Sequence, residues 1–567
     1  MRTYLMYLIL VIIQVFMISC DDFLEAKPED QVADIDFWKS ETNVSKFLTD
    51  TYAVTFLTQT DPENIIMLEA CSDNAYNMWT GFFTDVKLVA NGTQDAYSSV
   101  PSTIWKWRYG SIRRCFQIFE NIRNVPDISE DFIFKTEAET RFLLAYNYYI
   151  LTSLFGDVPL VSKVLTIEES KTIARAPKET VIEYALGELE KASSFLDGKT
   201  TERGRANWGA CQVLKARIYL MNNKYEDALN VINTLMGKYD LHKDGDTPYE
   251  DLFAGRAENS KEIIFSIIRD KTTGSISTGH IANQGFLLKA ISGGDAFCAI
   301  MPTGSLVDSY PMSDGRLIHE KGSSYSPNDP YKDRDPRFYQ SIIYPTGTIC
   351  SLNTSTNTVD WIAYDPEDAT TVPDHQYNAA YPSSTGYVWK KYVDVTPYGM
   401  TQITDCTNDL ILMRYADVLL MKAECLAEIK GIESKAEIID LIDMLRDRCH
   451  GGKVHRDNYN SKEDLINLVR NERRVELANE GLRYFDLLRW KIAENVPLKD
   501  GFGLSGVVYG AYMRLDGVGN TDRTVEVDGV PRRYVETRYF DPQKHYLQPI
   551  PQKEIDLNPN LKQNPNW

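Results

Sequence analysis

Apolar residues recur at three- and four-residue spacing through much of this chain, and this spacing constrains the fold more than any other feature. Side chains at that spacing lie on one face of an α-helix, which is then buried against its neighbours. The spacing runs from Phe37 to about Lys238 and returns in three later stretches, Ile411 to Ile429, Ala436 to Arg448 and Lys462 to Asn479. The sequence therefore predicts a mainly α fold.

Residues 270–405 interrupt the helical pattern. This stretch is rich in Gly, Pro, Ser, Thr, Asn and Tyr and has few long periodic segments. Such a composition favours turns and short strands over long helices. Because binding groups are commonly carried on loops held by a rigid scaffold, we expect this loop-rich excursion to contribute to a binding site.

One stretch of the helical part has the spacing of a helix hairpin with close contact. Small residues, Ala210 and Ala216, lie in its first predicted helix, and Tyr225 and Ala228 open the second. The spacing is similar to a degenerate tetratricopeptide unit, which buries its apolar face only against neighbouring units. A chance match in any helical protein is the alternative, since small-residue helix contacts are common.

The first residues have the pattern of an export signal. An almost unbroken apolar run extends from Leu5 to Ile18, and Ser19 and Cys20 follow directly. The run is shorter than the about 20 apolar residues that a spanning helix needs. We therefore expect residues 1–19 to be a signal peptide that is removed.

Cys20 itself resembles the modified cysteine of bacterial lipoproteins, because a small residue directly precedes it at the expected cut. In that class of protein the thiol receives diacylglycerol, and several acyl chains anchor a protein that does not span the membrane. The resemblance implies lipidation at Cys20. An ordinary secretion signal that happens to end at a cysteine is the alternative.

Composition excludes several classes of function. The chain has 567 residues and a formal net charge of −19, which argues against binding to the phosphate backbone of nucleic acid. The cysteines after Cys20 are widely scattered and include no CxxC pair, so a zinc ribbon is unsupported. We also find no GxSxG, HExxH or Walker motif. We expect no catalytic residue, no metal site and no cofactor.

A ladder of carboxylates at four-residue spacing could nevertheless serve a glycosidase, which needs two acids beside the bond it cleaves. The ladder comprises Glu472, Glu476 and Glu480, and the nearby bases are Arg473, Arg474 and Arg483. Residues four apart lie on one helix face, and interleaved arginines would hold the acids charged. We expect a structural set of ion pairs.

Two segments combine aromatic rings with polar side chains, as a sugar-binding surface requires. The first contains Asp73, Asn74, Tyr76, Trp79 and Phe82, and the second, in the excursion, contains Trp361, Tyr364 and Tyr381. These are our candidate ligand-binding residues. The alternative is that many of these rings belong to the core, because buried aromatics dominate in helical proteins.

Several blocks of sequence resemble the SusD/RagB family over nearly the whole chain. They are ETRFLLAYNYYILTSLFGDVPLV from Glu139, RYADVLLMKAECLAE from Arg414, NERRVELANEGLRYFDLLRW from Asn471 and LQPIPQKEIDLNPNLKQNPNW from Leu547. The last block, with its prolines, should pin the C-terminus onto the helical scaffold, with Trp567 as an apolar plug.

The resemblance implies a SusD-like fold of tetratricopeptide-like helix pairs in a lipid-anchored outer-membrane protein that faces the cell exterior. Proteins of this family act with a SusC-like TonB-dependent transporter and bind nutrients without cleaving them. We expect a helical N-terminal region over residues 20–240 and a C-terminal region over 241–567 that includes the excursion. The expected ligand is an oligosaccharide; a RagB-like peptide binder and a surface glycoside hydrolase are the alternatives.

Overall fold

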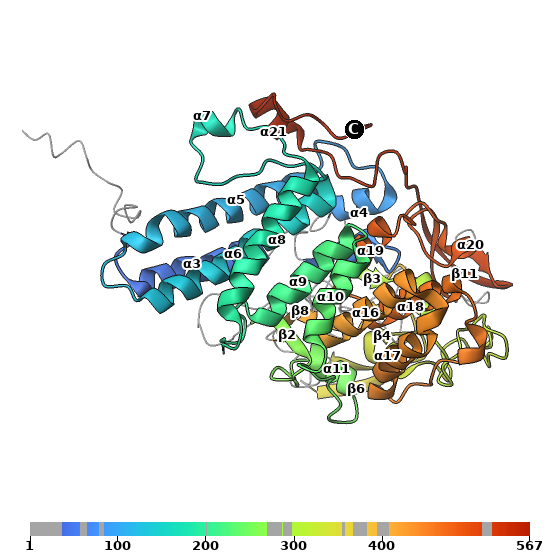
Figure 1. Cartoon of the computed structure of the whole chain (residues 1–567). Coiled ribbons are helices and arrows are strands. Elements are labelled where there is room, and N and C mark those ends of the chain that lie inside the picture. The colour runs from blue at the N-terminus through green and yellow to red at the C-terminus, as the bar shows by residue number, and fades with distance from the viewer. Residues whose placement is uncertain are drawn as a thin grey trace, which may run out of the picture.

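The computed structural model describes residues 37–56, 65–78, 84–199, 201–268, 286, 298–353, 358–366, 383–393, 408–512 and 524–567. The long elements are helices and the strands are short, which confirms the expected mainly α fold (Figure 1). Among these residues, no helix is both long enough and apolar enough to cross a membrane.

Helices that follow one another in the N-terminal half pack side by side. They are α3 (Glu41–Phe56), α4 (Thr84–Asn91), α5 (Ser99–Asn121), α6 (Glu130–Phe155), α8 (Lys178–Leu196), α9 (Trp208–Met221) and α10 (Tyr225–Leu235). α5 packs on α6, α6 on α8, α8 on α9 and α9 on α10 (Figure 1). The expected hairpin of small residues is present as the pair α9 and α10.

Local sequence explains where these helices begin and how closely they approach. The Ser129 side chain accepts a hydrogen bond from the Phe132 N–H and caps α6, and Asn207 caps α9 in the same way. Gly156, at φ +73°, ends α6. At Gly209 a Cβ atom would lie 1.9 Å from the Tyr239 hydroxyl, so only glycine permits this contact.

The C-terminal helices continue the same core. They are α16 (Tyr415–Ile429), α17 (Lys435–Arg448), α18 (Lys462–Glu476) and α19 (Arg483–Arg489). α16 packs on α10 of the N-terminal half as well as on α17 and α18. The hydrophobic core therefore contains helices from both sides of the boundary expected between residues 240 and 241. A division of the chain at this boundary stays a prediction.

Two predicted helices have different ends in the structure. Leu410–Arg414 form strand β8, antiparallel to β2 (Ile263–Ile267), and the helix begins only at Tyr415. All five β8 residues are buried, so both faces of the strand are covered and the apolar run shows no alternation. The helix predicted to reach Asn479 ends at Glu476, and Asn479 and Gly481 at positive φ form the turn that follows.

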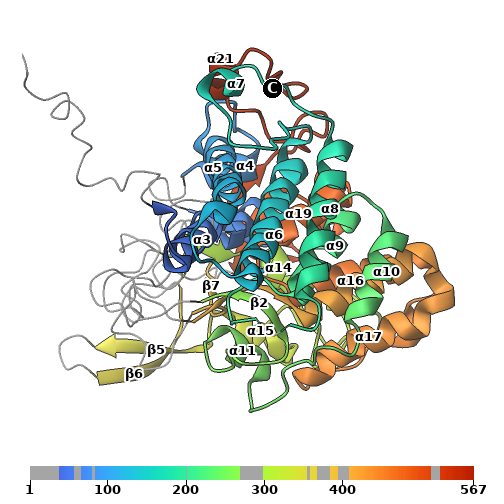
Figure 2. The same ribbon diagram turned by 60° about the vertical axis from the view of Figure 1, so that its left-hand side comes forward.

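The remaining strands form small antiparallel sheets. β1 (Ala75–Asn77) pairs with β3 (Ile300–Pro302), β4 (Ile342–Ile343) with β7 (Val388–Trp389), and β5 (Thr348–Asn353) with β6 (Thr358–Ala363). A three-stranded sheet has the order β10 (Thr524–Val527), β11 (Val530–Arg538), β9 (Gly506–Tyr512). The β5–β6 hairpin projects from the body of the molecule (Figure 2).

Short helices connect these elements. They are η2 (Ile65–Cys71), α7 (Ile167–Ser170), α11 (Pro248–Phe253), α14 (Gly304–Ser309), α15 (Pro336–Ser341), α20 (Pro497–Asp500) and α21 (Gln552–Leu557). Cys211 in α9 and Cys425 in α16 are buried free thiols, as their helical surroundings predict.

The C-terminal segment is held against the end of α6, near α7 (Figures 1 and 2). The Asn564 amide donates to the carbonyls of Phe155 and Gln548 at 2.9 and 2.8 Å, and the Gln548 N–H donates to Leu154 at 2.7 Å. Trp567 is only half-buried, and its indole N–H donates to the Leu547 carbonyl at 3.0 Å. The tail is therefore pinned as expected, but Trp567 is not a fully buried plug.

Candidate functional site

The turn before β1 is held by buried ion pairs and hydrogen bonds. The Asp73 carboxylate accepts from Arg483 Nε and Nη2 at 2.8 and 2.9 Å, and the Asn74 oxygen accepts from Arg474 at 2.7 Å. Asp73 is 4% exposed and Asn74 is fully buried. Burial alone would raise the pKa of Asp73, but Arg474 and Arg483 lower it to about 2. Both side chains fix the scaffold and offer no surface to a ligand in this conformation.

Two of the candidate rings also lie in the core. Tyr76 is buried, and its hydroxyl accepts from Lys87 Nζ at 3.2 Å. Tyr364 is 1% exposed, at the base of the β5–β6 hairpin. For these two residues the structure agrees with the alternative that the rings are core.

The other candidates are not placed by the structure. Trp79, Phe82 and Tyr381 lie outside the described residues, as does Cys20. Trp361 lies in β6 with its backbone opposite Cys350, but the structure does not describe its side chain. Ligand contact at these rings stays a prediction.

The described ends of the segments that carry those rings nevertheless meet in one place. Met78, which precedes Trp79, donates its N–H to the Ala299 carbonyl at 2.9 Å and accepts at Sδ from the Ser384 hydroxyl at 2.8 Å. Arg533 donates to the carbonyls of Ser383 and Pro366 at 3.2 and 3.4 Å. We call this meeting point, at Met78, Ala299, Pro366 and Ser384, the rim. Trp79 directly follows Met78, and the candidate rings Tyr364 and Tyr381 lie two residues before Pro366 and Ser383 in the chain.

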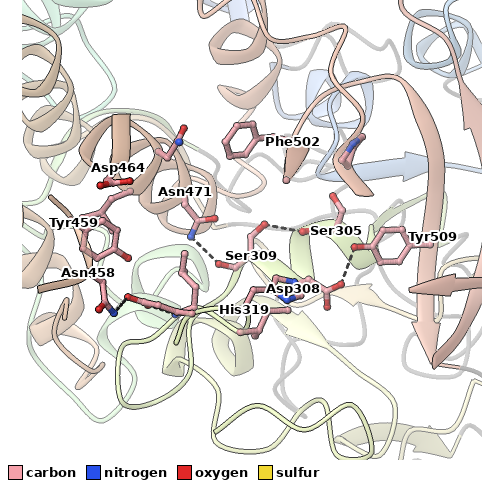
Figure 3. Close-up of a pocket in the computed structure, with 17 residues that line it drawn as sticks. Ser305, Asp308, Ser309, His319, Asn458, Tyr459, Asp464, Asn471, Phe502 and Tyr509 are labelled. Carbon is pink, nitrogen blue, oxygen red and sulfur yellow. Dashed lines mark hydrogen bonds between the residues drawn. The ribbon is translucent and has the colours of Figure 1, made fainter. Parts of the chain in front are cut away.

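Arg474 connects the turn before β1 to a neighbouring pocket. Its guanidinium donates to the hydroxyls of Ser305 and Ser309 at 2.6 and 2.7 Å and to the Gly501 carbonyl at 3.0 Å. These three residues line a pocket of about 400 Å³ between α14, α18 and the loop before β9 (Figure 3). The buried network below thus holds the pocket wall in position.

This pocket combines rings, amides and acids, and we call it the ring-and-amide pocket. Its rings are Tyr459, Phe502 and Tyr509, its amides Asn458, Asn467 and Asn471, and its acids Asp308, Glu320 and Asp464, with His319 at its edge. Our sequence reasoning missed it. Asn467 and Asn471 lie four apart on α18, a spacing that could have indicated a polar strip on one helix face.

A second pocket, of about 550 Å³, lies between α5, α7 and α21. Its floor includes Trp105 and Tyr109, and the exposed side chains of Ile167 and Leu557 stand at its edge. We call it the tail pocket. It lacks the amide strip of the ring-and-amide pocket, although Asn558 is among its lining residues.

The carboxylates of the ladder are ion-paired, as expected, but with other arginines than the sequence suggested, and all three are buried. Glu476 accepts from Arg414 at 2.7 Å, from Arg337 at 2.9 Å and from Arg448. Burial would raise the pKa of Glu476, but these three guanidinium groups hold it well below its usual range. The neighbouring bases point elsewhere: Arg473 pairs with Asp417 and Asp486, and Arg474 with Asp73. An acid held charged in this way cannot donate a proton to a leaving group.

No group of three or more His, Cys, Asp or Glu side chains among the residues described here is arranged to hold a metal ion.

Comparison with known proteins places the chain. A family model described as "SusD family" matches residues 261–567, more than half of the 567 residues. The chain belongs to the SusD family. A second model, described as "Starch-binding associating with outer membrane", matches residues 22–220.

Individual SusD-like relatives agree over most of the chain. SusD-like protein P2 of Formosa agariphila is 25% identical over 493 residues, which cover 84% of this chain and 83% of the relative. A SusD-like carbohydrate binding protein from Bacteroides fragilis is 27% identical with a TM-score of 0.78, covering 93% of this chain and all of that one. A laminarin binding SusD-like protein, 20% identical with a TM-score of 0.66, covers 93% of this chain and all of its own and shares the fold.

Proposed function

We propose that this protein binds a glycan at the outer surface of the outer membrane, without cleaving it, and passes it to a SusC-like TonB-dependent transporter. The observation that carries the proposal is membership of the SusD family, whose matched models and relatives are described as starch-binding, laminarin binding or carbohydrate binding. The ring-and-amide pocket supplies rings and amides of the kind that sugars require.

The state of the carboxylates supports binding without cleavage. A glycosidase needs one acid whose pKa is raised, so that it can protonate the leaving group. In the pocket, the Ser461 hydroxyl and nearby backbone N–H groups lower the pKa of Asp464 instead. Asp308 accepts from the Tyr509 hydroxyl at 2.9 Å and from Arg532 at 3.1 Å, so it is committed to its neighbours.

The rim is our proposed main binding surface, with Trp79 and Trp361 as its anchor rings. Hydrogen bonds join their segments near these rings, so we expect the two rings to act together on one ligand. We propose that Asp73 and Asn74, which the sequence suggests as candidate ligand contacts, instead position this surface. Arg483 binds Asp73 and Arg474 binds Asn74.

A panel of ligands tests the proposal by calorimetry. We expect one class of oligosaccharide to bind the purified protein saturably, while extended peptides do not. Saturable binding of peptides with no response to any glycan would favour the RagB-like alternative. Binding of neither class would reject the function altogether.

Membrane fractionation tests the location. We expect Cys20→Ala to release the protein from the outer-membrane fraction, because the acyl chains would have no attachment point. Ser19→Ala is the matched control, since it keeps a small residue before the cysteine. If Cys20→Ala stays membrane-bound, the anchor is not a lipid at this residue.

A further inference from the structure

We infer that the ring-and-amide pocket is a separate subsite that takes an uncharged sugar unit and discriminates against acidic sugars such as uronates. This inference rests on the proposed glycan-binding function. It adds a second contact site, distinct from the rim, and a chemical class of ligand.

Phe502 is suited to be the platform for a sugar ring. Its side chain is half-buried and lies on the opposite side of the pocket from Asn458 and His319 (Figure 3). The Arg483 guanidinium lies 5.6 Å from the ring centroid, and Arg483 is held in turn by both oxygens of Asp73. Because the ring is fixed from behind, little side-chain freedom is lost when a ligand stacks on it.

The backbone around Phe502 is fixed as well. Gly501 and Gly503 have φ angles of +81° and +135°, which favour glycine. The Gly503 N–H donates to Asp73 at 3.1 Å, and a Cβ at Gly503 would lie 2.1 Å from the Asn495 carbonyl oxygen. The loop therefore presents the ring in one position.

Amides and hydroxyls opposite the Phe502 ring match the hydroxyl groups around the edge of a sugar. The Asn471 amide donates to the Ser309 carbonyl at 3.0 Å, and no residue that the structure describes donates to its oxygen. Asn467 is exposed, and its side-chain amide makes no hydrogen bond within the described part of the chain. Each amide can both donate and accept, as a sugar hydroxyl does.

The charges around the pocket select against anions. Asp308, Glu320 and Asp464 line it, and no Lys or Arg is among the described residues that form its wall. Asp308 is paired with Arg532, but Glu320 and Asp464 accept their hydrogen bonds from uncharged donors. Leu317 N–H at 2.8 Å and Asn458 donate to Glu320, and Ser461 N–H at 2.9 Å donates to Asp464. A uronate or sulfate would face these like charges, and an uncharged sugar would not.

The volume also fits. About 400 Å³ lies within the range of roughly 300–1,000 Å³ that small-ligand pockets occupy.

Calorimetry of the full-length protein with a panel of hexasaccharides tests the inference. The neutral probes are malto-, laminari-, manno- and xylo-oligosaccharides, and the acidic probes are oligogalacturonate and oligomannuronate. We expect a neutral probe to bind best and Phe502→Ala to weaken it at least about tenfold. Leu557→Ala, at the tail pocket, is the matched control and should leave the affinity unchanged.

Asn467→Ala is a second variant, because this exposed side chain can be removed without disturbing the fold; we expect a loss of about threefold or more. Folded variants that bind the neutral probe as tightly as the wild type would overturn the subsite. Tightest binding of an acidic probe that depends on Phe502 would overturn the charge selection. If no glycan binds the wild type, the proposed function fails and the inference fails with it.

Discussion

Glu476 is the residue on which the buried charges of this protein converge. Its carboxylate is fully buried and accepts from Arg337, Arg414 and Arg448. Glu476→Gln would leave three buried guanidinium groups without their shared countercharge, so we expect the free energy of unfolding to fall by about 3–5 kcal/mol. Urea denaturation measures this. Glu463→Gln, on the exposed face of the same helix, should change it by less than about 0.5 kcal/mol.

Glu69 should make stability depend on pH. Burial raises its pKa to about 7, although Asn74 and the N–H groups of Asn479 and Gly481 donate to it. The folded state therefore holds this proton between pH 4.5 and 7, where the unfolded state releases it, and the stability contributed by Glu69 is lost as pH rises through that window.

Glu69→Gln removes the titration. The destabilisation that it causes should therefore shrink between pH 5 and pH 8, by an amount on the order of 3 kcal/mol. Denaturation of both proteins across this range measures the difference. A destabilisation that stays constant from pH 5 to pH 8 would show that Glu69 is charged in the folded state throughout.

For these residues, the sequence predicted that they form ion pairs, but it did not predict which residues are their partners. The spacing of Glu472, Glu476 and Glu480 indicated an ion-paired ladder, and they are paired. Their arginines come from other segments, and Arg337 lies 139 residues from Glu476 in the chain. In the same way, nothing local to Asp73 indicates that Arg483, 410 residues away, buries it.

At the scale of elements, periodicity predicted the helices and failed at a strand. The spacing of α17 and α18 follows a 3.6-residue period on one face, which a sequence displays directly. The residues of β8 are apolar on both faces, and a short run of this kind cannot be distinguished from a buried helix segment by period alone. The ring-and-amide pocket was missed because its walls come from elements far apart in the chain.

The C-terminal segment depends on Asn564. Its amide donates to two carbonyls, and its oxygen accepts from Arg175 at 2.6 Å, in a site only 4% exposed. Asn564→Ala would leave buried carbonyls unpaired, at a cost of about 1–3 kcal/mol. Limited proteolysis should then release the tail faster. Asn560→Ala is the control, because it removes one exposed hydrogen bond and should have little effect on the rate of cleavage. Equal rates of proteolysis in the two variants would show that Asn564 does not hold the tail.

At the scale of the whole molecule, the proposed function needs rings from two distant segments to act on one ligand. We expect Trp79→Ala and Trp361→Ala each to weaken glycan binding by about 2 kcal/mol, or roughly thirtyfold, as the loss of an anchor ring commonly does. Calorimetry measures the affinity, and circular dichroism checks the fold. Tyr97→Ala, an 80% exposed ring elsewhere on the surface, is the control. Folded tryptophan variants with unchanged affinity would move the site away from the rim.

In the proposed function, the protein holds a glycan without cleaving it. The most direct measurement incubates the protein with the tightest-binding oligosaccharide of the panel, isolates the complex and analyses the released glycan by chromatography. We predict a glycan of unchanged length with no new reducing ends. Shortened products, lost when a single carboxylate is replaced, would contradict it.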